Sequence, residues 1–162
     1  MSYLALLLLS FTVLAYALVG GVFLAFSDFI MRSLARASDV AGAEVMQIIN
    51  REVFHWVFMT LFLGMSGVSV AVLGYALFAL DGASGALIAA AGAVYLVGCF
   101  GVTVRFNVPL NNALEKFDLN DSAVLPFWLD TYVPSWSRWN TVRTLSCVVA
   151  SALLLAGLVQ TS

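Results

Sequence analysis

Charge is scarce in this chain of 162 residues, of which only 10% are Asp, Glu, Lys or Arg. An ordinary soluble domain carries about 25%. Hydrophobic residues make up 62%, and a soluble globule of this size could not bury them, because a folded domain still exposes much of its surface. The net charge of −2 provides no basic surface for nucleic acid. These features exclude a soluble domain, a disordered chain and a nucleic-acid partner, and they leave an integral membrane protein in contact with membrane lipid.

The few charged residues are grouped, and they leave four stretches without charge, at 1–27, 53–80, 82–104 and 144–162. About 20 apolar residues span a bilayer as a helix, and a helix satisfies its own backbone groups there. The sequence therefore predicts an all-α fold, a four-transmembrane-helix antiparallel bundle with two long, partly helical loops on one membrane face. It forms a single membrane domain over 1–162, with helices near 4–26, 40–79, 84–117 and 136–160.

The first apolar stretch contains Ala15-Tyr16-Ala17, which has the small-x-small form of a signal-peptide cleavage site. A signal peptide normally begins with basic residues and has a shorter apolar core. Here no Lys or Arg precedes the stretch, and the apolar run continues to Phe26. We therefore expect a retained membrane helix.

The distribution of Lys and Arg predicts the orientation. The second and third helices are separated by a short turn at 81–85, so the loops at 27–55 and 105–140 emerge on the opposite face. All seven Lys and Arg residues lie on that face. The positive-inside rule then makes the long loops cytoplasmic and both termini non-cytoplasmic.

Local patterns refine the helices. Apolar residues at Val45, Ile48, Ile49, Val53 and Trp56 form a helical stripe, so we expect the second helix to begin near residue 40 and to project beyond the bilayer. Pro109 cannot donate a backbone hydrogen bond, so we expect a break or kink there, with Asn107 and Asn111 pointing toward the bundle axis. Small residues in the membrane helices suit close packing, and the sequence leaves open whether the chain forms a homo-oligomer.

Polar residues gather where the helices meet the loop face. A polar group near a bilayer is costly and usually faces the bundle interior. Trp136, Asn140 and Arg143 are spaced i, i+4, i+7 and share one stripe. Alternatively, some of these side chains anchor the helices at the membrane interface instead of forming a site. In that case Trp128, Trp136 and Trp139 belong to an aromatic belt, and Arg138 extends its charge to the headgroups. The candidates are Ser27 and Asp28; Asn50, Glu52 and His55; Arg105, Asn107, Asn111 and Asn112; and Trp136, Asn140 and Arg143.

Glu52 and His55 have the Glu-x-x-His spacing of di-iron bundles. Such a site needs two of these motifs, and His55 is the only histidine, so a di-iron site and bis-His haem ligation are excluded. A mononuclear site from His55, Glu52 and one of Asp28, Glu115 or Asp130 is an alternative, but we assign no metal site, and the cofactor stays unknown. We interpret Cys99 and Cys147 as small buried hydrophobes.

Three segments resemble a known family. They are Met46-Gln47-Ile48-Ile49-Asn50, Val108-Pro109-Leu110-Asn111-Asn112-Ala113-Leu114 and Trp136-Ser137-Arg138-Trp139-Asn140-Thr141-Val142-Arg143-Thr144. The sequence is similar in these segments to the anthrone oxygenase-like family of four-helix membrane proteins, mostly catalogued as a domain of unknown function. The resemblance implies the same helix order, and for the few characterised members it implies oxidation of anthrones to anthraquinones with molecular oxygen.

Two classes of function stay open. The first is an oxidoreductase, a membrane-embedded oxygenase acting on a planar aromatic molecule such as an anthrone, phenol or quinol. Its catalytic candidates are His55, Glu52 and Arg143, with a base taking the proton and Arg143 facing the developing anion. Its substrate-binding candidates are Asn50, Asn107, Asn111, Trp136, Asn140 and Arg105. The alternative is a non-enzymatic lipid- or quinone-binding module, or a subunit of a membrane complex.

Overall fold

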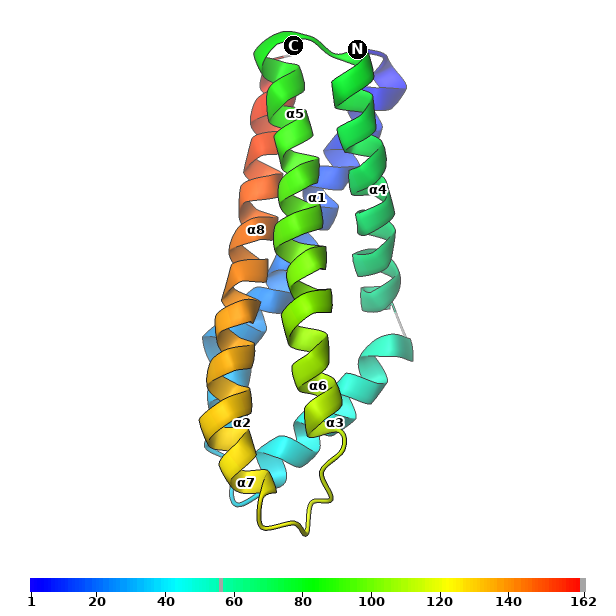
Figure 1. Cartoon of the computed structure of the whole chain (residues 1–162). Helices are drawn as coiled ribbons and strands as arrows, with labels where there is room; N and C mark the ends of the chain where they lie inside the picture. Colours follow the sequence, from blue (N-terminus) through cyan, green and yellow to red (C-terminus); the bar gives the residue numbers. More distant parts are fainter. Residues whose placement is uncertain (56, 161–162) are drawn as a thin grey trace.

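A computed structural model describes residues 1–55 and 57–160, and within these ranges the chain is helical, with no β-strand. Four helical paths are long and apolar enough to cross a membrane, at Tyr3–Ala35, Val57–Ala79, Gly82–Leu114 and Val124–Val159. They run antiparallel, and both chain ends lie at the same end of the bundle as the turn between α4 and α5 (Figure 1). The two long connections lie at the other end. The predicted all-α four-helix membrane fold is confirmed.

Each path except the second combines α-helix with a π-helical segment, written η. The first path consists of α1 (Tyr3–Ala25), η1 (Phe26–Ile30) and α2 (Met31–Ala35). It is followed by α3 (Ala41–Glu52), the 3₁₀ turn η2 (Val53–His55) and α4 (Val57–Ala79). The third path is α5 (Gly82–Val94), η3 (Tyr95–Gly101), η4 (Thr103–Asn107) and α6 (Val108–Leu114). The fourth is α7 (Val124–Pro126), η5 (Phe127–Tyr132) and α8 (Val133–Val159).

The membrane part of the bundle packs around one apolar core contributed by α1, α4, α5, η3 and α8. At its centre the rings of Tyr16 and Tyr95 stack with centroids 4.5 Å apart. Cys99 and Cys147 are buried free thiols in this core, with their Sγ atoms 3.5 Å apart. A Cβ on Gly20 would lie 2.9 Å from that of Cys147, so a small residue is needed for α1 to approach α8.

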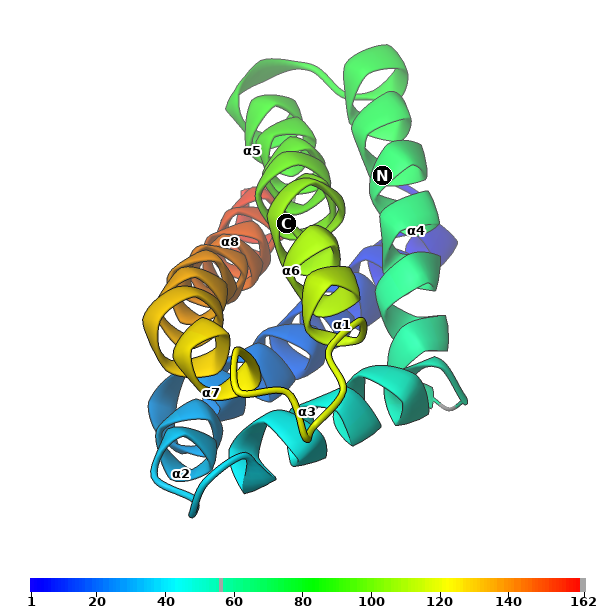
Figure 2. The ribbon, with the colours of Figure 1, turned by 60° about the horizontal axis from the view of Figure 1, so that its bottom comes forward.

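The predicted helix over 40–79 is divided in the structure. α3 ends at Glu52 and crosses the loop end of the bundle, whereas α4 runs along it (Figure 2). The reason is a second apolar cluster at this end, which includes Ala43 and Met46 of α3 together with Leu114 and Trp128. Of the stripe that predicted one long helix, Ile49 packs against this second cluster, whereas Val45 and Ile48 are 41% and 44% exposed. Trp56, the last member of that stripe, lies outside the described residues.

The other helices differ from the prediction at their ends. The third path ends at Leu114 and has no break at Pro109. The π turn η4 ends at Asn107, two residues before this proline. A π turn is wider than an α turn, so the ring fits without ending the helix. The first path extends to Ala35 and the fourth begins already at Val124. Pro134 lies inside this continuous path, two residues after the π segment η5 ends.

Candidate functional site

A cavity of about 230 Å³ lies where the bundle meets α3. About 20 residues span the hydrocarbon core, so counting from Gly82 along the third path, and back from Val159 along the fourth, places its boundary near Val102 and Asn140. The cavity is at this depth. Four of its lining residues are polar, and they are Asn50, Thr103, Asn111 and Arg143. The rest of the wall is apolar or aromatic, and it includes Phe23, Phe26, Met46, Phe58, Phe62 and Trp136.

Arg143 is the charged residue of the cavity wall, and its side chain is only 5% exposed. One terminal nitrogen donates to Asn140 Oδ1 at 2.6 Å and the other to Thr103 Oγ1 at 3.4 Å. The guanidinium carbon lies 4.2 Å from the ring centroid of Phe23 and 5.0 Å from that of Trp136. Nε has no hydrogen-bond partner. The cation is thus held by amide, hydroxyl and aromatic groups, and it retains an unused donor.

No carboxylate neutralises Arg143 among the residues that the structure describes. Glu52 faces His55, with 3.8 Å between Oε2 and Nδ1, and Asp28 pairs with Arg32. The structure therefore excludes an ion pair of Arg143 with either of these carboxylates. A desolvated charge without a counter-ion is costly, so this end of the cavity favours an anion.

Asn140 positions Arg143. It is fully buried, and its Nδ2 donates to the carbonyl oxygen of Phe23 and to Ser27 Oγ, both at 2.7 Å. Phe23 lies just before η1, where the change from α to π register shifts the backbone hydrogen bonds by one residue. The amide thereby ties α8 to the first path, and its oxygen remains available for the guanidinium.

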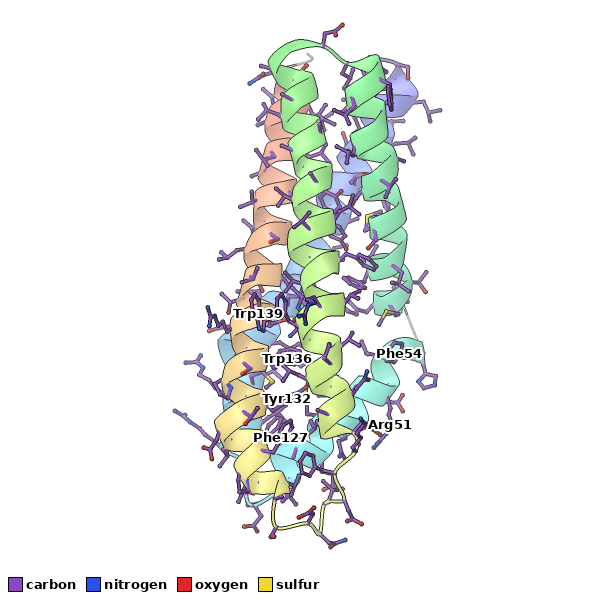
Figure 3. The ribbon with its side chains drawn as sticks, in the orientation of Figure 1. Arg51, Phe54, Phe127, Tyr132, Trp136 and Trp139 are labelled. Carbon is purple, nitrogen blue, oxygen red and sulfur yellow. The ribbon has the colours of Figure 1, made fainter. Side chains whose placement is uncertain are left out.

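Asn111 holds two aromatic donors. Its Oδ1 accepts a hydrogen bond from Tyr132 Oη at 2.9 Å and from Trp136 Nε1 at 2.8 Å. Phe127, Tyr132 and Trp136 follow one another along the start of the fourth path (Figure 3). Trp128 and Trp136 are buried in the second apolar cluster, so the aromatic-belt interpretation is wrong for them. Asn111 therefore fixes the indole of Trp136, which forms one wall of the cavity.

Two further predicted asparagines face inward. Asn107 is 1% exposed, and its Nδ2 donates to the carbonyl oxygen of Trp136 at 3.2 Å, while its Oδ1 is buried without a partner. The prediction that Asn107 and Asn111 point into the bundle is confirmed. Asn50 lines the cavity from α3, and its Nδ2 is a buried donor without a partner. Arg143 Nε is thus an unused donor of the site, whereas the Asn50 amide has the Tyr132 hydroxyl beside it.

The other predicted site residues lie outside the cavity. The side chains of Glu52 and His55 are 67% and 64% exposed. Val53 and Phe54, which lie between them in the chain, do line the cavity, whereas His55 lines a separate cavity along α4. Arg105 is exposed on the outer face of η4. The mononuclear metal alternative is not supported, because Asp28 and Glu115 pair with Arg32 and Arg51, and the described residues hold no cluster of three metal-ligating side chains.

α3 closes the cavity and is fixed along its length. Gly42 packs so closely against α2 that an added Cβ would lie 2.0 Å from the carbonyl oxygen of Leu34. Gln47 donates to the carbonyl oxygens of Leu114 and Phe117, and so caps the end of the third path. Near its C-terminal end, Arg51 Nη1 lies 2.6 Å from Glu115 Oε1. These contacts position Asn50 over the cavity.

Sequence reasoning missed the apolar wall and Thr103. Phe23, Phe26, Phe58 and Phe62 have the same character as ordinary core residues, so no pattern distinguishes them. Thr103 carried one usable signal, because it precedes Asn107 by four residues and therefore shares its helix face. The π turns that position these residues have no sequence signature that we could have used.

The fold and this cavity define a class: four-helix membrane proteins with a buried cationic, aromatic pocket at one membrane boundary. The anthrone oxygenase family profile matches residues 51–153. The match covers well over half of the chain, so the chain belongs to the anthrone oxygenase family. It includes α4, α5, α6 and most of α8, and it begins at the end of α3. No curated protein and no solved structure matches the chain.

Proposed function

We propose that the cavity binds a planar aromatic molecule with an ionisable oxygen, of the anthrone or phenol type, and promotes its oxygenation. The observation that carries this proposal is Arg143, a buried cation without a carboxylate partner, placed between the rings of Phe23 and Trp136. A ligand that is both flat and anionic satisfies the rings and the charge together. Sites for small molecules typically combine apolar walls with a few convergent polar groups.

The polar groups of the wall indicate how the ligand lies. The Arg143 guanidinium faces the charge of a phenolate or enolate oxygen, and the Asn50 amide, which also lies beside the Tyr132 hydroxyl, faces a second oxygen of the same ring system. Both groups belong to the cavity wall. A cavity of about 230 Å³ is below the roughly 300–1,000 Å³ common for drug-sized ligands, which favours a compact ring system over a long or branched molecule.

The chemistry is an oxidation by molecular oxygen. An anthrone loses a proton from its methylene carbon, and the resulting enolate is an electron-rich anion that reacts with oxygen. One oxygen atom becomes the new carbonyl of the anthraquinone and the other leaves in water, so that atoms and electrons balance. The role of Arg143 is to stabilise the anion before this reaction, as preorganised donors do elsewhere.

Proton removal is the role left for Glu52 and His55. The cavity lining includes no Asp, Glu or His among the described residues. Glu52 and His55 adjoin the lining residues Val53 and Phe54 in the chain, but their side chains are largely exposed and His55 lines a separate cavity along α4. They therefore accept the proton outside the cavity rather than above the ring. This division predicts that Arg143 controls affinity, whereas the Glu52–His55 pair controls turnover.

The test is binding and oxidation of an anthrone by the protein in nanodiscs. Loss of a charge-assisted hydrogen bond costs roughly 1.5–3 kcal/mol, so Arg143→Gln should bind about 10 to 150 times more weakly. The double variant Glu52→Gln, His55→Gln should bind normally and form anthraquinone more slowly. Arg36→Gln, which removes an exposed arginine of the same loop end, is the matched control. Equal affinity of wild type and Arg143→Gln would refute the proposal.

A second candidate is a binding module for quinones or related lipids without turnover. It is favoured by one observation, namely that no titratable base lies over the cavity among the residues described. The same experiment separates the two functions. Tight binding of an anthrone and of its anthraquinone, without product and without oxygen consumption, identifies a binding module.

A further inference from the structure

The four membrane paths form a ring, and glycines close three of the four seams at which neighbouring paths meet. In this ring the first and third paths each adjoin both α4 and α8 (Figure 2). At each closed seam, a Cβ added to a glycine would lie under 3.0 Å from an atom of the neighbouring path. Backbones this close leave no room for a ligand to pass. These contacts are Gly20 with Cys147 between α1 and α8, Gly98 with Ser146 between the third path and α8, and Gly92 with Ser69 between α5 and α4.

The fourth seam, between α1 and α4, is more open. Near the middle of both helices, Tyr16 Oη and Ser69 Oγ lie 2.6 Å apart and join them. On the side of the chain termini the two helices are separated by a second apolar cavity of about 480 Å³. Its lining comes from α1 and α4, and it includes Leu8, Leu9, Thr12, Met65 and Val72. No glycine of the described chain brings α1 and α4 together as at the other seams.

On the loop side, the same seam forms a thin wall of the cavity in which Arg143 lies. Val22 of α1 and Phe58 and Met59 of α4 line this cavity. Val22 is 40% exposed, whereas Trp136 and Arg143 are 4% and 5% exposed. Because residues of the cavity interior are nearly buried, the exposed part of Val22 faces outward. One side chain therefore separates the cavity from the surroundings of the bundle at this position.

This thin wall lies at the edge of the hydrocarbon. A span of about 20 residues counted from Tyr3 ends at Val22, and one counted back from Ala79 ends at Thr60, next to Met59. Flat aromatic molecules with one polar group suit this level of a bilayer, as tryptophan and tyrosine side chains do. At the loop end, by contrast, α3 covers the cavity and is fixed along its length. The route from the bilayer is therefore less obstructed than the route from water.

Phe58 closes this route on the inside. Its ring is half-buried and lies edge-on to that of Phe23, with centroids 5.6 Å apart. The guanidinium carbon of Arg143 lies 4.2 Å from the centroid of Phe23. A ligand that moves the Phe58 side chain aside therefore arrives beside the cation.

We propose that the seam between α1 and α4 is a lateral portal, through which a neutral aromatic ligand enters the cavity from the bilayer between Val22 and Phe58. The ligand ionises only once it lies beside Arg143. The portal rests on the proposed function, because it requires that the cavity binds such a ligand. It adds a separate role for Val22, which controls the rates of entry and exit, whereas Arg143 controls affinity.

The test measures how fast anthrone enters and leaves the cavity, by stopped-flow quenching of tryptophan fluorescence in nanodiscs. Val22→Phe enlarges the side chain in the portal and should slow association and dissociation alike by about tenfold, which is a barrier higher by about 1.4 kcal/mol. Val22→Ala should accelerate both rates. A residue on the path acts in both directions, so Kd should change much less than either rate. The matched control is Leu18→Phe, one turn away on α1 and 64% exposed but outside the cavity lining, and its rates should equal those of wild type.

The outcomes separate the portal from the proposed function. If wild type binds anthrone and both Val22 variants show the rates of Leu18→Phe, the portal is overturned and the proposed function stands. A change confined to dissociation would also overturn the portal, because Val22 would then contact the bound ligand rather than lie on its path. Absence of anthrone binding to wild type would refute the proposed function, and the portal with it. Val22→Ala keeps the test decisive if the larger side chain prevents folding, since it only removes methyl groups at an exposed position.

Discussion

Replacement of Arg143 by methionine distinguishes a ligand-binding arginine from a structural one. The variant loses the charge-assisted hydrogen bond to Asn140, which contributes about 1.5–3 kcal/mol. It also loses cation–π contacts with Phe23 and Trp136, worth about 2 kcal/mol when desolvated. The substitution also removes the cost of burying a charge without a counter-ion, which is several kcal/mol and favours the variant. The terms oppose each other, so we expect the free energy of unfolding without ligand to change by less than about 2 kcal/mol.

Asn140→Ala should be more harmful than Arg143→Met. It leaves the guanidinium buried without its best acceptor, and it removes the donor for the carbonyl oxygen of Phe23 and for Ser27. An unsatisfied buried group costs about 1–3 kcal/mol, and more when it is charged. The double variant Asn140→Ala, Arg143→Met should recover part of this loss, because the unpaired charge is then absent.

The assay is unfolding in detergent, with and without a phenolic anthrone. Wild type should be stabilised by the ligand, whereas Arg143→Met should not, since a ligand stabilises only the state that it binds. A structural arginine in a buried ion pair would behave differently, because breaking such a pair costs about 3–5 kcal/mol. A loss of that size in ligand-free Arg143→Met, with a smaller loss in Asn140→Ala, would refute the reasoning.

Three other predictions follow from the same contacts. A phenol bound beside Arg143 should have a lowered pKa, because the cation stabilises the phenolate. Two opposite charges 4 Å apart attract by about 4 kcal/mol at an effective dielectric constant of 20, which corresponds to a pKa lower by roughly 3. The phenolate absorption band measured against pH would show it, and an identical pKa in Arg143→Gln would contradict it. Asn111→Leu should cost about 1–3 kcal/mol for each aromatic donor left unpaired and should change the tryptophan fluorescence, whereas Asn112→Leu, at an exposed position, should do neither. Gly42→Ala should destabilise the protein by about 1–3 kcal/mol, since the new Cβ meets backbone, while Gly64→Ala, with open space around it, should be neutral or stabilising in a thermal unfolding measurement.

The number of membrane helices and the polar end of the bundle could be predicted from the sequence because charge is so costly in a bilayer. The grouping of 16 charged residues marked where each span ends. The stripe of Trp136, Asn140 and Arg143 was also predictable, since α8 is a regular helix over these positions. On such a helix, spacings of four and seven residues place side chains on one face.

The division between α3 and α4 could not be predicted from periodicity. An apolar stripe looks the same whether its helix continues along the bundle or crosses its end, and only the second apolar cluster decides between them. The burial of Trp128 and Trp136 also depends on this second apolar cluster, which periodicity does not reveal. An indole in a membrane protein suits the headgroup level, and for Trp136 burial is favoured because its Nε1 donates to Asn111.

The π turns explain why the cavity wall is assembled from residues that no helical stripe connects. Phe26 lies in η1 and Thr103 in η4, and both line the cavity. An α-helix advances by about 100° per residue, and the extra residue of a π turn shifts every side chain that follows it around the helix. Phe23 and Ser27, both bonded to Asn140, lie on opposite sides of the start of η1. A strictly α-helical first path would alter this arrangement, so the irregular backbone is part of what holds Arg143 in place. π turns in membrane and soluble helices are often found at functional sites, and here three of them, η1, η4 and η5, contain residues that line the cavity or donate to its wall.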